Sequence, residues 1–148
     1  MMRVFSLFLG IIMSILGFIS NFATFTPLND SHTDYEGVYI SIEQIVDFEG
    51  GKVVDVVWHN DSDETACFGL GYRVEYLDGE EWVDVQMEDF AVPEIACIVE
   101  PGKYGTQSYR LKYFNMLRPG TYRLITEFYI QNSDLGALYT YDCFDVKY

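Results

Sequence analysis

The chain has 148 residues, of which 49% are hydrophobic, and it carries a formal net charge of −14 at pH 7. With only nine Lys and Arg residues it lacks the clustered positive charge that a nucleic acid requires, so nucleic-acid binding is excluded as a function. The negative charge instead keeps the domain soluble or favours cationic partners, and net charge alone does not decide between these two roles. The 12 Tyr and 11 Phe residues are too many for a disordered chain and favour β-strands, so we expect an all-β protein with one core.

The N-terminus begins with a short positive segment, Met1 to Arg3, followed by an uncharged apolar run from Val4 to Ser20. As a helix this run would be roughly 25 Å long, close to the ~30 Å hydrocarbon core of a bilayer. Residues 1–25 are therefore predicted to form a hydrophobic helix that is either a cleaved signal peptide or an N-terminal membrane anchor. In both alternatives the rest of the chain lies outside the cytoplasm, secreted or anchored, and it touches the membrane only if the segment is retained.

The segment after the apolar run, residues 26–36, is rich in polar and turn-forming side chains such as Pro27, Asn29 and Asp34. We interpret it as a polar tether. From Gly37 onward apolar and polar residues alternate, so the folded domain is predicted to cover residues 37–148.

The first half of that domain contains three segments with the alternation of half-buried strands. They run from Val38 to Glu43, from Val54 to His59 and from Leu70 to Tyr76. Asp78-Gly79 then predicts a tight hairpin that leads to a short strand around Trp82.

The second half is less regular. Pro93 interrupts an apolar stretch between Glu88 and Gly102, and proline is tolerated only at an edge, so an edge strand is expected there. A further strand is predicted at 108–113. The last strand runs from Ala137 to Tyr148, but its two halves place apolar residues on opposite faces, so we expect a β-bulge near Asp142-Cys143.

The clearest strand lies within Leu117 to Ile130, where a Pro119-Gly120 turn precedes a regular alternation. In immunoglobulin-type sandwiches a Tyr near the start of the penultimate strand locks a corner, and a core residue follows two positions later. Tyr122 and Leu124 occupy these places. About seven or eight strands without helices predict a two-sheet sandwich or a small barrel, and Tyr122 favours an immunoglobulin-like antiparallel sandwich. The predicted structural core comprises Val54, Val56, Trp58, Tyr72, Val74, Trp82, Leu111, Tyr122, Leu124 and Phe128.

Three cysteines, Cys67, Cys97 and Cys143, lie in the domain that is expected outside the cytoplasm, where disulfides are permitted. One pair among the three would form a bridge, and the sequence does not select which. The alternative is that all three are small buried hydrophobic residues. None has the C-x-x-C spacing of a zinc or redox motif.

Candidates for catalysis and metal binding are few. A nucleophilic site needs a Ser or Cys beside a His, and the two histidines, His32 and His59, fall in the tether and on an outward strand face, so no catalytic residue and no cofactor is predicted. The loop that contains Asp61, Asp63 and Glu64 gathers oxygen ligands suited to calcium. Its spacing does not match an EF-hand loop, so these three residues are weak candidates and a solvated acidic loop is the simpler interpretation.

The outer face of the last two strands carries a more promising surface. Exposed aromatic side chains with an Arg are typical of surfaces that bind a protein or a sugar ring. The alternative is that these tyrosines only line the sheet. The predicted binding surface comprises Arg123, Ile125, Tyr129, Tyr139 and Tyr141.

Several segments occur in an order that resembles a known family: V-V-D-V-V-W-H-N, F-G-L-G-Y-R-V-E-Y-L-D-G-E-E-W-V-D-V, V-E-P-G and L-R-P-G-T-Y-R-L. The chain is similar in these motifs to the bacterial immunoglobulin-like domain of small exported envelope proteins of Gram-positive bacteria. That family is a fold rather than an activity, so the resemblance implies a β-sandwich and no catalytic residue.

These observations lead to one main functional hypothesis and two alternatives. We expect a non-catalytic extracytoplasmic module for protein interaction or spacing at the cell envelope, with an unknown envelope or extracellular protein as partner. A secreted carbohydrate-binding module that uses the outer-face tyrosines is the first alternative. A secreted hydrolase inhibitor that acts through its loops is the less favoured one.

Overall fold

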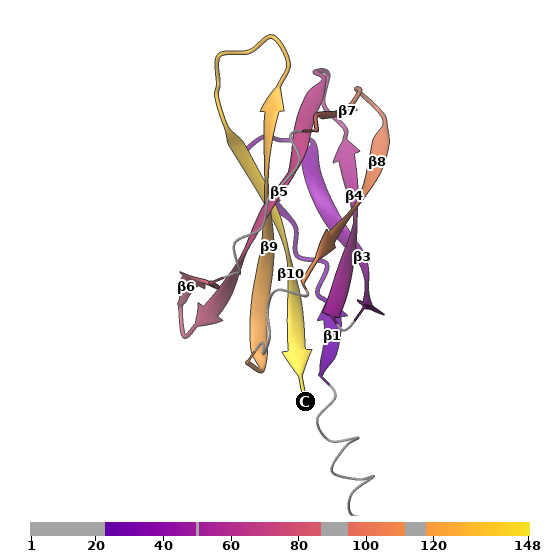
Figure 1. Ribbon diagram of the computed structural model, residues 1–148. Helices are drawn as coiled ribbons and strands as arrows, with labels where there is room; N and C mark the ends of the chain where they lie inside the picture. Colours follow the sequence, from indigo (N-terminus) through magenta and orange to yellow (C-terminus); the bar gives the residue numbers. More distant parts are fainter. Residues whose placement is uncertain (1–22, 50, 87–94, 112–117) are drawn as a thin grey trace, which may run out of the picture.

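The computed structural model describes residues 23–49, 51–86, 95–111 and 118–148 (Figure 1). These residues form ten strands and contain no helix, so none of them belongs to a membrane-spanning helix. The predicted N-terminal helix lies outside the described residues. The strands are β1 (Thr24–Pro27), β2 (His32–Thr33), β3 (Val38–Phe48), β4 (Gly51–Asn60), β5 (Ala66–Asp78), β6 (Glu81–Asp84), β7 (Cys97–Val99), β8 (Tyr104–Arg110), β9 (Gly120–Ile130) and β10 (Leu138–Lys147).

The strands make two antiparallel sheets that face each other as layers, as Figure 1 shows. The larger sheet has the order β1-β10-β9-β5-β6, with β2 also paired to β10 and β7 to β5, and the smaller sheet has the order β3-β4-β8. This arrangement agrees with the predicted all-β sandwich. The described strands exceed the predicted number because β1 and β2 lie in a region where no strand was expected.

The core lies between the two sheets and is rich in aromatic rings. Trp58 of β4 stacks on Phe68 of β5 with ring centroids 4.2 Å apart, and the edge of Phe128 meets it at 5.9 Å. Of the predicted core, Val54, Val56, Trp58, Val74, Leu111, Tyr122, Leu124 and Phe128 are buried. Tyr72 is partly buried and packs against them.

The prediction for Trp82 was wrong. Trp82 lies on β6, and its ring packs on the outer face of the larger sheet against the guanidinium of Arg123 at 4.3 Å. Alternation alone misplaced it, because a short edge strand can turn a large ring toward either face.

The corner at the start of β9 forms as the sequence predicts. The hydroxyl of buried Tyr122 donates a hydrogen bond of 2.7 Å to the carbonyl of Arg118, and Leu124 is fully buried two residues later. Gly120 has a φ of +142°, and a Cβ there would lie 2.8 Å from the ring of Tyr76, so only glycine fits this turn. These contacts fix where β9 begins.

The segment predicted as a polar tether belongs to the sandwich instead. Thr24 to Pro27 pair with the end of β10, and the ring of Phe25 stacks on Phe144 at 6.1 Å. His32 and Thr33 pair with Tyr141 and Thr140. Most residues from 26 to 33 are polar because this segment pairs along one edge of the larger sheet with one side in water. Hydrophobic alternation does not detect a strand of that kind.

The predicted bulge in the last strand is also absent. The pairing of β10 with β9 is continuous from Leu138↔Phe128 to Val146↔Gly120. Thr140 and Asp142 point inward with Phe144 and Val146, and all four are buried. The strand looked irregular because two of its inward residues are polar.

The three cysteines are free thiols, so the predicted bridge does not form. Cys97 pairs with Phe68 and packs against the core, whereas Cys67 pairs with Ile98 and therefore faces the opposite side of the same sheet. Cys143 is opposite Arg123 on β9, and Cys67 is opposite Tyr129 near the other end of that strand. Side chains on opposite faces or at opposite strand ends cannot meet the geometry of a disulfide.

Candidate functional site

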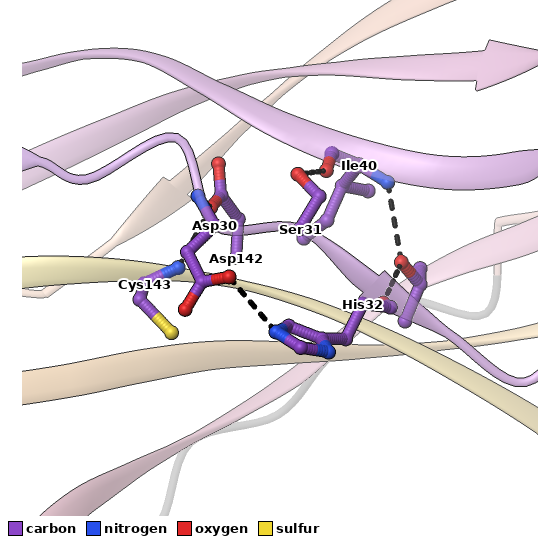
Figure 2. Close-up of polar contacts among 7 residues, drawn as sticks. Asp30, Ser31, His32, Ile40, Asp142 and Cys143 are labelled. Carbon is purple, nitrogen blue, oxygen red and sulfur yellow. Dashed lines mark hydrogen bonds and ion pairs between the residues drawn. The ribbon is translucent and has the colours of Figure 1, made fainter.

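A cluster of polar side chains lies where β10 crosses the edge of β3, and it brings together residue types that catalysis uses (Figure 2). The side chain of Asp142 accepts from the backbone nitrogens of Ile42 at 2.7 Å and Asp30 at 2.9 Å. The hydroxyl of Thr140 accepts from the nitrogen of Ile40 at 3.2 Å, and Ser31 donates to the carbonyl of Ile40 at 2.6 Å.

These contacts supply partners to the outer edge of β3. An edge strand leaves alternate N–H and C=O groups unpaired, and burial without partners would cost free energy. Ser31, Thr140 and Asp142 fill that need, together with Thr33, whose hydroxyl donates to the carbonyl of Val38. We call these four residues the β3 seam, because their side chains join the two sheets along one edge.

The geometry of the seam does not fit nucleophilic catalysis. His32 contacts Asp30 with a nitrogen to oxygen distance of 2.9 Å, but the hydroxyl of Ser31 is directed to Ile40. Burial raises the pKa of the nearby Cys143 thiol to about 12, so at neutral pH it is not a thiolate. His59 is on the smaller sheet, where its ring stacks on Tyr39 at 4.5 Å.

The acidic loop after β4 is organised by Asn60. The buried amide of Asn60 donates to the carbonyls of Glu64 at 2.7 Å and Val99 at 2.8 Å. Its oxygen accepts from the nitrogen of Ser62 at 3.0 Å. Asp61, Asp63 and Glu64 are exposed, and no group of three or more His, Cys, Asp or Glu residues in the described part of the chain is arranged to hold a metal ion.

The outer face of the larger sheet contains a groove of about 340 Å³. It forms where the pairing of β5 with β9 is interrupted, because three residues of β5, from Gly69 to Gly71, lie opposite the single residue Glu127. A Cβ on Gly71 would meet nothing within 4 Å, so the missing side chain leaves open space above the sheet. The groove is lined by Gly69, Gly71, Tyr72, Arg73, Ile125, Glu127, Tyr129 and Tyr139.

Three of the predicted surface residues come together in this groove. Ile125 is only 3% exposed and forms the floor, while Tyr129 is 48% exposed. The hydroxyl of Tyr129 donates to a carboxylate oxygen of Glu127, and this contact raises the pKa of the Tyr129 phenol. The guanidinium of Arg73 lies 5.2 Å from the ring centroid of Tyr139.

The other two predicted residues form a separate stack nearer the C-terminus. Arg123 lies between the rings of Trp82 at 4.3 Å and Tyr141 at 4.5 Å, and it forms a largely buried ion pair with Glu75. The Tyr141 ring also stacks on the ring of His32 at 4.7 Å. The rings and the guanidinium in this stack cover one another. The predicted binding surface is therefore divided into an open groove and a closed stack.

Residues 34–141 match a family model described as a bacterial Ig-like domain. The match covers well over half of the chain. The chain belongs to the bacterial Ig-like domain family. A search of curated proteins finds no match to it.

Membership in this family accounts for the two-sheet sandwich. Bacterial Ig-like domains are generally non-catalytic and are typically found outside the cell or at its surface. The match begins at residue 34, after β1 and β2, and ends within β10. The groove lies within the matched residues.

Sequence reasoning missed five groove residues: Tyr72, which was assigned only to the core, and Gly69, Gly71, Arg73 and Glu127. The two glycines carried a usable signal, because glycine inside a strand pattern indicates a bulge or a close approach of another molecule. Arg73 and Glu127 carried none of their own, since each looks like an ordinary polar residue on the solvent face of a strand.

Proposed function

We propose that this bacterial Ig-like domain is a non-catalytic interaction module that acts outside the cytoplasm at the cell envelope and binds a protein partner through the groove. The observation that carries the proposal is the open groove beside Tyr129, on a domain where the polar cluster at the β3 edge is used for folding. Exposed aromatic rings around an apolar floor are typical of protein-binding sites.

The position of the groove supports the same role. β1 begins beside the C-terminal end of β10, where Thr24 pairs with Lys147. Figure 1 shows this end at the bottom of the sandwich. Tyr139 is near the start of β10 and Tyr129 is near the end of the antiparallel strand β9, so both lie toward the other end of the sandwich. A chain held from its N-terminal side would therefore present the groove away from its attachment.

The tyrosine geometry favours a protein over a sugar. Flat stacking on sugar needs coplanar rings with free faces, but Tyr141 is covered by His32 and Arg123, and Tyr139 lies against Arg73. Tyr129 alone of the three is exposed. A glycan array probed with the full chain would support the carbohydrate alternative only if binding disappeared on removal of the Tyr129 ring.

Site-specific photocrosslinking in cells tests the proposal. We expect a photoreactive residue at position 129 of the full-length chain to give a discrete crosslinked protein. The same residue at position 104, where Tyr104 is 75% exposed on the other sheet, is the matched control and should give none. Gly71→Val should abolish the crosslink from position 129 because its side chain fills the groove. Equal crosslinking from both positions, or protection of the domain from external protease, would contradict the proposal.

A further inference from the structure

The groove holds an acidic group beside an aromatic ring, with an apolar floor beneath. Glu127 is half-buried on β9, and the hydroxyl of Tyr129 fixes one of its oxygens at the groove wall. Among the described residues, the carboxylates within 4.0 Å of a basic nitrogen are Asp30 beside His32, Asp47 beside Lys52 and Glu75 beside Arg123, so Glu127 has no such partner among them. The contrast with Glu75 is direct, since that residue projects from the same face and is paired with Arg123.

The groove already shows how it receives a cation. Arg73 places its guanidinium 5.2 Å from the centre of the Tyr139 ring, which is the geometry of a cation–π contact. Tyr129 is 48% exposed and stands next to the carboxylate. A second positive group at this end of the groove would meet both an aromatic ring and an unpaired carboxylate.

We propose that the groove binds a basic segment of a partner protein, with one Lys or Arg side chain inserted so that its charge meets Glu127 and the Tyr129 ring and its aliphatic stem lies over Ile125. The volume of about 340 Å³ accommodates one long side chain, and long basic side chains pack their stems on apolar surface. The net charge of −14 attracts cationic partners over long distances. This inference rests on the proposed function and names the chemistry of its ligand.

The rim of the groove suits the rest of such a segment. Ile98 on β7 is 58% exposed and pairs with Cys67, which in turn pairs with Tyr129. These three side chains form a row across the outer face of β7, β5 and β9. Apolar residues next to the basic side chain would contact this row.

The test is a titration of the full-length chain in an uncharged detergent with a short Gly/Ser peptide that carries a central Lys, followed by NMR. The control ligand is the same peptide with acetyl-lysine, which keeps the stem but removes the charge. We expect the Lys peptide to shift the amide signals of Gly69 and Gly71 and to bind about tenfold more tightly than the acetylated peptide. Its affinity should fall as salt is added.

Substitutions test which carboxylate attracts the Lys side chain of the peptide. Glu127→Gln should weaken binding of the Lys peptide about tenfold, whereas Glu81→Gln on β6 alters the net charge equally outside the groove and should change it less than about twofold. Tyr129→Leu should weaken binding about threefold. Arg73→Gln should strengthen it, because a repelling cation is removed. Equal effects of Glu127→Gln and Glu81→Gln would show attraction to bulk charge only and overturn the proposal, as would equal binding of the acetylated peptide.

The outcomes also separate this inference from the proposed function. If the crosslink from position 129 forms and is lost in Gly71→Val, but the Lys peptide does not bind, the groove binds a partner that is not basic and only the ligand assignment fails. If neither crosslink nor peptide binding is found, both fail. If the groove signals shift with protein concentration alone, the occupant is a second copy of the chain and the basic-segment proposal is overturned.

Discussion

The two faces of β9 and β10 both carry polar side chains, but they use them differently. On the inner face, Thr140 and Asp142 are fully buried and bond to backbone groups of the neighbouring sheet. On the outer face, Glu127 and Tyr129 bond to each other at the wall of an open groove. In the described part of the chain, every buried side-chain nitrogen and oxygen has a hydrogen-bond partner. Polar residues that face the core therefore complete the fold, whereas, among the described residues, the side chains of Glu127 and Tyr129 in the groove bond only to each other and not to backbone groups of the other sheet.

The largest effect is expected at the seam. Asp142→Ala removes the acceptor for the backbone nitrogens of Ile42, Asp30 and Cys143 and leaves them without that partner in or near the core. Lost bonds to a charged group and unsatisfied donors together should lower the free energy of unfolding by about 4 kcal/mol. Urea denaturation followed by the fluorescence of buried Trp58 measures this change.

Asp145→Ala is the matched control, because Asp145 lies three residues along the same strand but faces outward and accepts from the hydroxyl of Thr121 at 2.7 Å. Its loss should cost about 1 kcal/mol or less. If both alanine variants lowered the free energy of unfolding by similar amounts, the inner carboxylate of Asp142 would be no more important for folding than the outer one of Asp145.

A smaller effect is expected for Thr140→Val, which keeps the shape of the side chain. The variant loses the bond that Thr140 accepts from Ile40 at 3.2 Å and the one it donates to the carbonyl of His32 at 2.8 Å. We expect the free energy of unfolding to fall by about 2 kcal/mol. Thr106→Val on β8 is a control for the change from Thr to Val at a strand position outside the seam. An unaffected midpoint for Thr140→Val would mean that Thr140 does not contribute to the stability of this edge.

Two buried tyrosines of the core predict that the stability of the domain depends on pH. Burial raises the pKa of Tyr122 to about 12 and raises the pKa of Tyr109 as well. Since folding favours the neutral phenol, the stabilisation is complete below the ordinary pKa of 10.0 and is lost as the pH rises from there through about 12. Tyr122→Phe should lower stability at pH 7 by about 1 kcal/mol, through the lost bond to Arg118, and weaken the alkaline decline. A decline of unchanged steepness in that variant would remove Tyr122 as a cause.

The sequence was sufficient for the features that depend on apolar periodicity. Alternation between Tyr122 and Ile130 predicted which residues face the core, and all five on that parity are buried. The sequence was insufficient where polar residues are buried in the core. The expected bulge near Asp142 was wrong because a carboxylate is costly to bury without partners, and the β3 partner of Asp142, the nitrogen of Ile42, lies a hundred residues away in the chain. No local pattern contains that information.

The groove could be predicted only in part for a related reason. The row of Ile125, Tyr129 and Tyr139 follows from strand parity and from pairing of the last two strands. The hollow itself depends on an irregular register between β5 and β9, which places Gly69 and Gly71 opposite Glu127. Register between strands that are distant in the chain is set by tertiary packing, so the sequence indicated the aromatic residues but not the space between them.

The smallest effect on stability is expected in the groove, and this expectation separates the two faces most sharply. Glu127→Gln preserves the acceptor for the Tyr129 hydroxyl, and no ion pair involving Glu127 occurs among the described residues. The free energy of unfolding should therefore change by less than about 0.5 kcal/mol, as for an ordinary surface substitution. Glu75→Gln is the paired control on the same face, because it breaks the ion pair with Arg123, whose side chain is only 18% exposed, and should cost more. If Glu127→Gln destabilised the domain as much as Glu75→Gln, the carboxylate of Glu127 would be a structural group, and a ligand that must displace its contacts could not use it.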